Sequence, residues 1–343
     1  MIQLKALLVG SGDSYLIEKN SQRYLIDAGG SQEIIKSLVK GHIDLAICTH
    51  NDSDHSNGFI GLLKSPTHDI KEIWLPGVWA SVIKFIKEGS YFTAKPREIS
   101  IEEITKEAEI LQLLEDDDED IDNFTDELVE LESISSAKHL PYRLDLYHPT
   151  YEPVFRVIKY NIDRILEICR LAYERGTVIR WFFPSLNEGS IRRNFKPINS
   201  NYGLKMKKVK GNDLLSFYKL AYLTSQNKHS LIFEYLNNSK PIALFTADAT
   251  IDNQRLYKDQ IIVTAAHHGA ESNKIIYKNI QGNLIWVRSD RPSSKRPCQS
   301  FLDLSDKYCL RCTKQKTGKK EEEIVFEFKN QNWTKISGLK CDC

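Results

Sequence analysis

The 343-residue sequence has no long apolar segment. None of its apolar runs approaches the roughly 18–20 residues that a membrane-spanning helix needs, so we expect no membrane partner. Residues 1–5 also lack the basic, apolar and small-residue pattern of a secretory signal. Seven cysteines, an odd number, then favour reduced thiols over a disulfide framework. These absences predict a cytoplasmic protein.

The chain also has almost no net charge, at +1, but its charges are unevenly distributed. Residues 101–133 hold 15 acidic residues and one lysine, a balance of −14, which leaves 46 Lys and Arg against 31 Asp and Glu, or about +15, elsewhere. A basic body suits a polyanion, although a solvated charged surface is the ordinary alternative. The acidic segment could block a basic cleft by mimicking nucleic acid, dock a protein partner's basic surface, or be a solvated loop.

Apolar runs of strand length fall into two groups separated by a helical region. The first group predicts an antiparallel meander and then a buried strand, at residues 4–9, 15–17, 24–26 and 45–48. The second group lies at residues 231–235, 242–246, 261–264 and 284–287. Residues 154–171 carry apolar side chains at helical spacing. We therefore predict an α/β fold, a four-layer αββα sandwich. Its halves are residues 1–80 and 211–343, and residues 81–210 form a mostly helical, partly acidic insertion or cap.

The most informative stretch is the polar segment Thr49–His55, which directly follows the apolar run 45–48. It contains four side chains able to bind metal within six positions: His50, Asp52, Asp54 and His55. Side chains of a regular strand alternate between faces, but those of the loop at its end can converge. Imidazole with carboxylate suits a hydrolytic metal site. The alternative is a polar turn in which Asp54 caps the following helix.

Two further polar clusters follow apolar strands. Asp248 comes after residues 242–245, and His267 and His268 come after residues 261–266. A strand end holds the backbone rigid while its side chains point into a shared cleft. The three clusters together offer enough ligands for two metal ions about 3.5–4 Å apart, as in two-metal phosphoesterases.

These residues resemble the metallo-β-lactamase superfamily. The motif His50-x-Asp52-x-Asp54-His55 is similar to its signature, with aspartate where a second histidine is commoner. The lactamase-like domain of ComEC-type DNA-uptake proteins is similar in further segments: residues 12–17, 25–30, 49–58, 227–232, 245–249 and 267–270. Residues 286–289 with Arg291-Pro292 or Arg296-Pro297 resemble that branch's closing segment, without the histidine usually found before the proline. The resemblance covers residues 1–77 and 211–305.

The resemblance implies a two-metal site. Its implied ligands are His50 and Asp52 for one ion, Asp54 and His55 for the other, and Asp248 bridging both. His267 or His268 would complete the second site; His267 is favoured, with His268 lining the cleft in a catalytic role. Asp54 could also orient the attacking water. His229 is a further candidate ligand of the first ion, or else a plain surface or cleft histidine.

The ligand set is rich in oxygen, which favours manganese or magnesium, although zinc generally binds such sites more tightly. We expect two divalent ions, manganese or zinc, with magnesium as a further choice. A metal-activated hydroxide would then attack phosphorus in line.

Arginines and cysteines near the C-terminus supply two further hypotheses. Arg288, Arg291 and Arg296 follow a strand that should end at the cleft, where they could bind substrate phosphates. A structural zinc site could be formed by two cysteine pairs, which are otherwise reduced thiols: Cys309, Cys312, Cys341 and Cys343.

The sequence thus predicts a metal-dependent phosphodiesterase, foremost a DNA nuclease without sequence preference. One alternative is a hydrolase of a small phosphodiester or other ester. Another is a regulatory or binding subunit of a larger complex, such as a defence system, whose activity needs a partner.

Overall fold

The computed structural model describes residues 1–87, 152–203, 230–289, 296–310, 321–338 and 340–341. Within these ranges the centre of the molecule is built from two large sheets. The first has nine strands, in spatial order β10 (Ser200–Tyr202), β8 (Val178–Pro184), β7 (Glu72–Pro76), β5 (Leu45–Ile47), β3 (Gln22–Ile26), β2 (Tyr15–Lys19), β1 (Ile2–Ala6), β16 (Ile324–Lys329) and β17 (Asn332–Ser337).

The second sheet has six described strands, in the order β15 (Lys307–Cys309), β14 (Ile280–Arg288), β13 (Arg255–Thr264), β12 (Lys240–Phe245), β11 (Phe233–Asn237) and β9 (Phe195–Pro197). A small ribbon pairs β4 (Gly41–Ile43) with β6 (His68–Ile70). The predicted meander is confirmed, because β1, β2 and β3 pair in antiparallel register.

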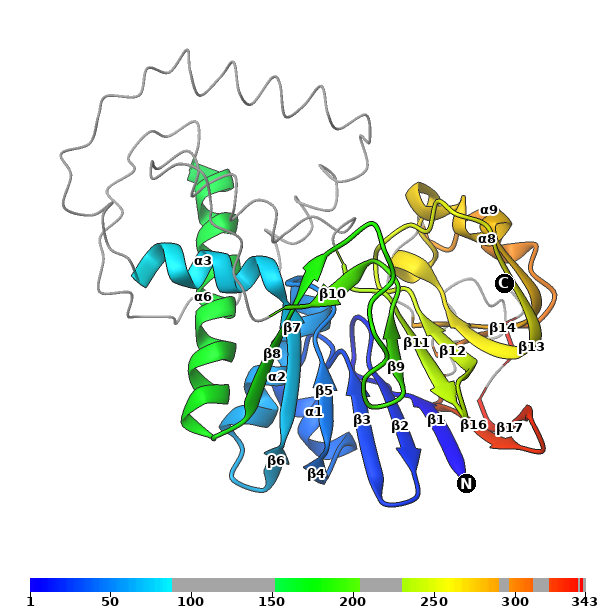
Figure 1. Cartoon of the computed structure of the whole chain (residues 1–343), viewed down its shortest axis with the longest axis horizontal. Helices are drawn as coiled ribbons and strands as arrows, with labels where there is room; N and C mark the ends of the chain where they lie inside the picture. Colours follow the sequence, from blue (N-terminus) through cyan, green and yellow to red (C-terminus); the bar gives the residue numbers. More distant parts are fainter. Residues whose placement is uncertain (88–151, 204–229, 290–295, 311–320, 339, 342–343) are drawn as a thin grey trace, which may run out of the picture.

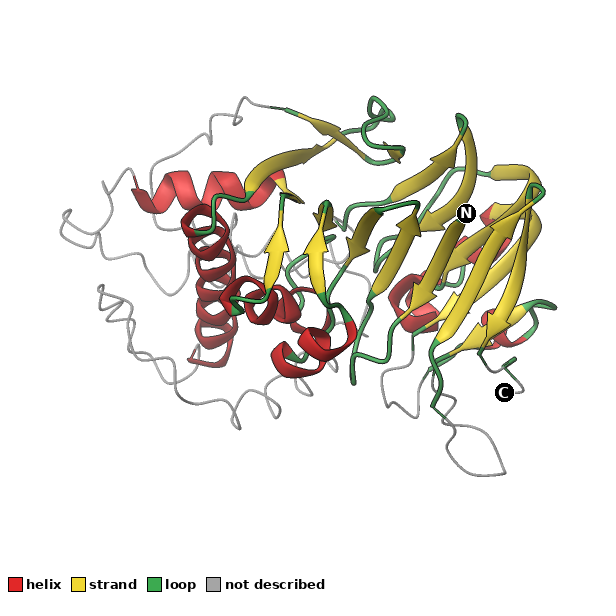
Figure 2. Cartoon of the chain, turned by 90° about the horizontal axis from the view of Figure 1, so that it is seen from below, coloured by secondary structure: helices red, strands yellow, loops and turns green. Residues whose placement is uncertain are grey.

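Helices pack on both outer faces of the sheets. On the nine-stranded sheet these are α1 (Gln32–Leu38), α2 (Ser53–Lys64), α3 (Gly77–Lys87) and α6 (Glu152–Glu174). On the six-stranded sheet they are α8 (Ile276–Asn279) and α9 (Gln299–Leu302), near the 3-10 turns η3 (Ala266–Gly269) and η4 (Glu271–Asn273). Figure 1 shows α3 and α6 on one side of the strands and α8 and α9 on the other, and Figure 2 shows the same layers from below.

Three buried apolar clusters fill the spaces between these layers. The cluster between the sheets contains aromatic side chains of both, such as Trp74 and Phe182 facing Phe233. A second lies between the nine-stranded sheet and its helices, and a third between the six-stranded sheet and α8 and α9. Three apolar layers between four structural layers confirm the predicted αββα sandwich.

Helix α6 confirms the helix predicted over residues 154–171, and its side chains from residue 160 on show the amphipathic pattern. Ile165 and Ile168 are buried on the face toward the sheet, whereas Arg170 and Glu174 are exposed and form an ion pair with each other. No described helix is long and apolar enough to cross a bilayer.

The structure differs from the predicted domain division at residues 178–202. This segment was assigned to a helical insertion, but it adds β8 and β10 to the first sheet and β9 to the second. β9 and β10 have only three residues each, and the seven residues of β8 do not alternate regularly between buried and exposed. Their pairing with β7 and β11, which lie far away in the sequence, fixes them as strands.

Parallel pairing brings the functional segments to one edge. Strands β3, β5, β7 and β8 run parallel in the first sheet, as do β12, β13, β14 and β15 in the second. The backbone joins the two sets across the sandwich, where Leu231 N donates to Thr49 O at 2.9 Å. The carboxyl ends of parallel strands are the usual place for a binding site in an α/β sheet.

Candidate metal centre

The loops after β5, β12 and β13 carry the polar residues that the sequence singled out. Helix α2 begins inside the first of these loops, so Asp54 and His55 lie in its first turn. Asp52 is the N-cap residue of α2, but its side chain makes no capping hydrogen bond. The alternative in which Asp54 caps the helix is therefore wrong, and the carboxylates of this loop are directed to other partners.

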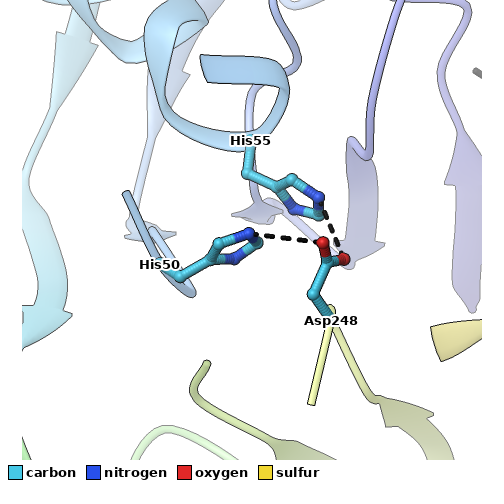
Figure 3. Close-up of side chains that lie close together, drawn as sticks. All are labelled: His50, His55 and Asp248. Carbon is cyan, nitrogen blue, oxygen red and sulfur yellow. Dashed lines mark ion pairs between the residues drawn. The ribbon is translucent and has the colours of Figure 1, made fainter. Parts of the chain in front are cut away.

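A first cluster consists of His50, His55 and Asp248, whose ligand atoms all lie within 4.8 Å of one another. His50 Nε2 is 3.6 Å from Asp248 Oδ2, and His55 Nε2 is 3.2 Å from Asp248 Oδ1. Figure 3 shows the two imidazoles, from either end of the loop, turned toward the carboxylate of the opposite sheet. Asp52 lies beside this cluster, with Oδ2 3.6 Å from His50 Nε2.

The residues of the first cluster fit a divalent ion. His50 Nε2, His55 Nε2 and Asp248 Oδ1 are buried polar atoms without a hydrogen-bond partner, which is costly unless something else satisfies them. Nitrogen and oxygen ligands about 2.1 Å from a tetrahedral ion lie roughly 3.4 Å apart. The separations of 3.2 and 3.6 Å agree with that spacing.

A second cluster is formed by Asp54, His55 and His268, all buried. His268 Nε2 is 3.2 Å from Asp54 Oδ2. His55 belongs to both clusters, so the two groups are adjacent. The described residues thus provide two neighbouring groups of imidazole and carboxylate.

The carboxylates make this region favourable for positive charge. Burial and the neighbouring His55 lower the pKa of His50, but Asp52 and Asp248 outweigh them and raise it to about 10. Burial raises the pKa of Asp248, whereas the three surrounding histidines hold it well below its ordinary value. A buried carboxylate that stays ionised among imidazoles can bind a cation, whether proton or metal.

Asp27, directly after β3, orients His55 by a hydrogen bond to the ring nitrogen that faces away from the cluster. Its Oδ2 accepts hydrogen bonds from His55 Nδ1 at 2.8 Å and from Thr49 Oγ1 at 2.7 Å, and its Oδ1 accepts from Thr49 N at 2.8 Å. Donation from Nδ1 leaves His55 Nε2 with its lone pair toward the cluster, which is the usual arrangement for a metal-binding histidine. No motif in the sequence marks Asp27 as part of the site, although it follows an apolar strand as the ligands do.

Asp13 and Ser289 orient His268 in the same way. His268 Nδ1 lies 2.9 Å from Ser289 Oγ and 3.2 Å from Asp13 Oδ1, and Ser289 Oγ also donates to Asp13 Oδ1. All three side chains are buried. Burial lowers the pKa of His268, but Asp13 and Asp54 outweigh it and raise the pKa to about 9. The sequence does not predict that Asp13 or Ser289 contacts the metal-binding residues.

The adjacent histidines of η3 point in different directions. Both have left-handed backbone conformations, with φ of 47° at His267 and 53° at His268. His267 Nε2 lies 3.6 Å from Asp248 Oδ2 and accepts a hydrogen bond from Arg296 Nη2 at 2.7 Å. The sequence favours His267 as ligand and places His268 in the cleft lining. Here His268 contributes to a ligand cluster, and the His267 lone pair faces an arginine.

The remaining candidates are placed as follows. Arg288 is fully buried, where Nη1 donates to His268 O at 3.3 Å and Nε to Cys309 Sγ at 3.4 Å, so it faces the interior rather than a substrate. Cys309 and Cys341 are buried together, and a hydrogen bond between their thiols raises the pKa of Cys309. Outside the described residues lie His229, Arg291, Cys312, Cys343 and the acidic segment 101–133.

Comparison with known proteins gives a family match over the first part of the chain. Residues 7–139 match the model of the metallo-beta-lactamase superfamily, and this range includes the whole of the loop after β5. No curated protein matches the chain. One solved structure, described as the hydrolase AbOPH in the beta lactamase superfamily, is 11% identical and has a TM-score of 0.31. That match covers 69% of this chain and 55% of the other, so the chain spans just over half of that protein's length.

The matched segment, the αββα layers and the buried His/Asp clusters agree with one another: the chain has a metallo-β-lactamase-like fold, its residues 7–139 match the model of that superfamily, and its buried clusters contain residues able to bind metal.

Proposed function

We propose that the protein is a metal-dependent phosphodiesterase, foremost a nuclease that cleaves DNA without sequence preference. The observation that carries the proposal is the pair of buried clusters that share His55, one completed by Asp248 and the other by His268, both from the opposite sheet. Two divalent ions held there would supply a water of lowered pKa and neutralise charge on a phosphoryl group. The ligands would be His50 and Asp248 for one ion, with Asp52 beside it, and Asp54 and His268 for the other. His55 would bind one of the two ions through Nε2, because its Nδ1 donates to Asp27.

The protein's own side chains support a phosphate ester as substrate. Arg296 places its guanidinium beside His267, whose Nε2 is 3.6 Å from Asp248 Oδ2. Arginine keeps its positive charge at any relevant pH and recognises phosphate oxygens through paired donors. A fixed positive charge at the edge of the site favours an anionic diester over a neutral ester.

A nucleic-acid substrate is supported by the charge distribution. Outside residues 101–133 the chain carries about +15, and contacts between such a surface and phosphates give affinity without sequence preference. We propose DNA as the substrate and the cytoplasm as the place of action. Deleting residues 115–122 tests whether the acidic segment restrains the site or binds a protein partner: unchanged activity and DNA affinity would exclude the first.

A substrate panel tests the proposed function. The purified chain is incubated with manganese, magnesium or zinc and with plasmid, single-stranded DNA, RNA or a chromogenic phosphodiester. We expect plasmid and single-stranded DNA to be cleaved, and Asp248→Asn to abolish cleavage while the chain stays folded. Activity on the chromogenic ester alone would replace the nuclease by a small-phosphodiester hydrolase. No hydrolysis at full metal occupancy would indicate a regulatory or binding subunit.

A further inference from the structure

Helix α6 contacts the metal-binding loop at the residue between two of its ligands. Asn51 separates His50 from Asp52 and is fully buried. Its side-chain Nδ2 donates to Asn161 O, in α6, at 3.0 Å. Its main-chain oxygen accepts a hydrogen bond from Arg164 Nη1, one helical turn further along α6. The helix thus binds Asn51 through both its side chain and its backbone.

The other carbonyl groups of this loop are satisfied by the sandwich itself. Thr49 O accepts from Leu231 N at 2.9 Å, and His50 O accepts from Cys48 Sγ at 3.1 Å. Asn51 O also accepts from Ser56 Oγ at 3.1 Å, within the same segment. Arg164 is therefore a charged side chain, from outside the two sheets, that bonds to the backbone of the ligand loop.

Helix α6 is held firmly enough to act as an anchor. Ile165 and Ile168 are buried in the apolar cluster that also contains Phe59 and Leu62 of α2. Lys64 of α2 forms an ion pair of 3.0 Å with Glu167 of α6. The first turn of α2 carries Asp54 and His55, so α6 supports the helix and the loop that hold most of the ligands. It also lies beyond residues 7–139, which match the superfamily.

We infer that Arg164 is a positioning residue of the metal centre: by binding the Asn51 carbonyl it holds His50 and Asp52 toward Asp248. A hydrogen bond from a cation to a backbone carbonyl is stronger than a neutral one. Without it the Asn51 carbonyl would keep only the neutral hydrogen bond from Ser56 Oγ, so the peptide between the two ligands would be held less firmly. Ligands must keep their geometry to within fractions of an ångström. Partners outside the ligand shell typically change metal affinity by about 10–100-fold.

The test compares two arginines of the same helix. Arg170 is exposed and bonds only to Glu167 and Glu174 among the contacts described for it, so Arg170→Ala is the matched control for Arg164→Ala. The full chain is titrated with Mn²⁺ or Co²⁺ against a competing chelator, and the Co²⁺ absorption spectrum reports the ligand geometry. We expect Arg164→Ala to weaken binding of at least one ion about 10–100-fold and to alter the spectrum. Arg170→Ala should match the wild type, and Arg164→Lys should recover part of the loss.

Each other result is decisive. Wild-type affinity and spectrum in Arg164→Ala would overturn the inference, as would an equal loss in Arg170→Ala. If Arg164→Ala fails to fold without metal, Arg164→Lys decides: weaker metal binding in the folded variant supports the role, and unchanged binding refutes it. The inference rests on the proposed metal centre but not on the substrate. A wild-type chain that binds no ion would therefore refute both, whereas a chain that binds ions but cleaves no DNA leaves the role of Arg164 standing.

Discussion

Replacing Asp27 by asparagine tests how far the ligands depend on the carboxylate behind them. Asp27 uses both oxygens as acceptors, for Thr49 N on one side and for Thr49 Oγ1 and His55 Nδ1 on the other. An amide has only one oxygen, so whichever way it is oriented its NH₂ group faces a donor. At least one hydrogen bond to a charged acceptor is lost inside a fully buried site.

The magnitude follows from that loss. A hydrogen bond to a charged group contributes about 1.5–3 kcal/mol. Since roughly 1.4 kcal/mol corresponds to a tenfold change in an equilibrium constant, metal binding through His55 should weaken by about 10–100-fold. The same range is typical of outer partners of metal-binding histidines. Because His55 Nε2 can bind one of the two ions, we expect at least that ion to bind more weakly.

The assay is a chelator-competition titration with Mn²⁺, together with urea unfolding of the metal-free protein. Asp69→Asn is the matched control, because Asp69 Oδ2 contacts His42 Nδ1 at 2.9 Å in a similar pair whose side chains are 68% and 36% exposed. It should leave metal binding unchanged and cost little stability, as exposed pairs do. If Asp27→Asn binds both ions as tightly as the wild type, the assigned orienting role is refuted.

Three further predictions follow from buried contacts. Asp13→Asn should weaken metal binding through His268 and change the Co²⁺ spectrum, measured as above; an unchanged spectrum would show that Ser289 suffices. Arg296→Gln should raise KM for a phosphodiester more than it lowers kcat, and equal effects on a neutral ester would contradict phosphate recognition. Glu72→Gln should cost about 2–3 kcal/mol in urea unfolding, because a buried carboxylate loses its charge pairing with two partly exposed arginines. Burial raises the pKa of Glu72, but hydrogen bonds from a tryptophan and those arginines outweigh it and lower the pKa. Its contribution is therefore present above the unfolded glutamate pKa, near 4.3, and is lost as pH falls through the lower folded value. The difference in free energy of unfolding between wild type and variant should shrink below about pH 4. A difference independent of pH would refute the ionic origin of the Glu72 contribution.

Much of the fold followed from local patterns. The meander was visible as apolar runs of strand length broken by glycine, and α6 as a helical stripe of apolar side chains. Such patterns depend on neighbours a few residues apart, so the sequence alone specifies them. Strands β9 and β10 were not predicted because they have three residues each, and β8 because its side chains do not alternate regularly; pairing with distant strands defines all three.

The candidate site divides in the same way. The sequence alone predicted that the segment Thr49–His55 is part of the site, because its imidazoles and carboxylates are close in the sequence and follow a buried strand. The partner carboxylate Asp248 was also expected, on the same ground of a polar residue after an apolar strand. The segment Thr49–His55 and Asp248 come together because two sets of parallel strands face each other. The resemblance to the superfamily implied this arrangement, and the tertiary structure shows it.

The amino-acid sequence by itself determined the meander, helix α6 and which residues can bind metal, since these properties belong to short stretches of chain. Only the tertiary structure decided which atoms meet. Left-handed backbone angles at two successive histidines turned His268 toward Asp54 and His267 toward Arg296. Packing brought Asp13 to Ser289 and α6 to Asn51, across 276 and 110 residues of sequence. Side-chain direction at a strand end depends on those contacts, and no local pattern encodes them.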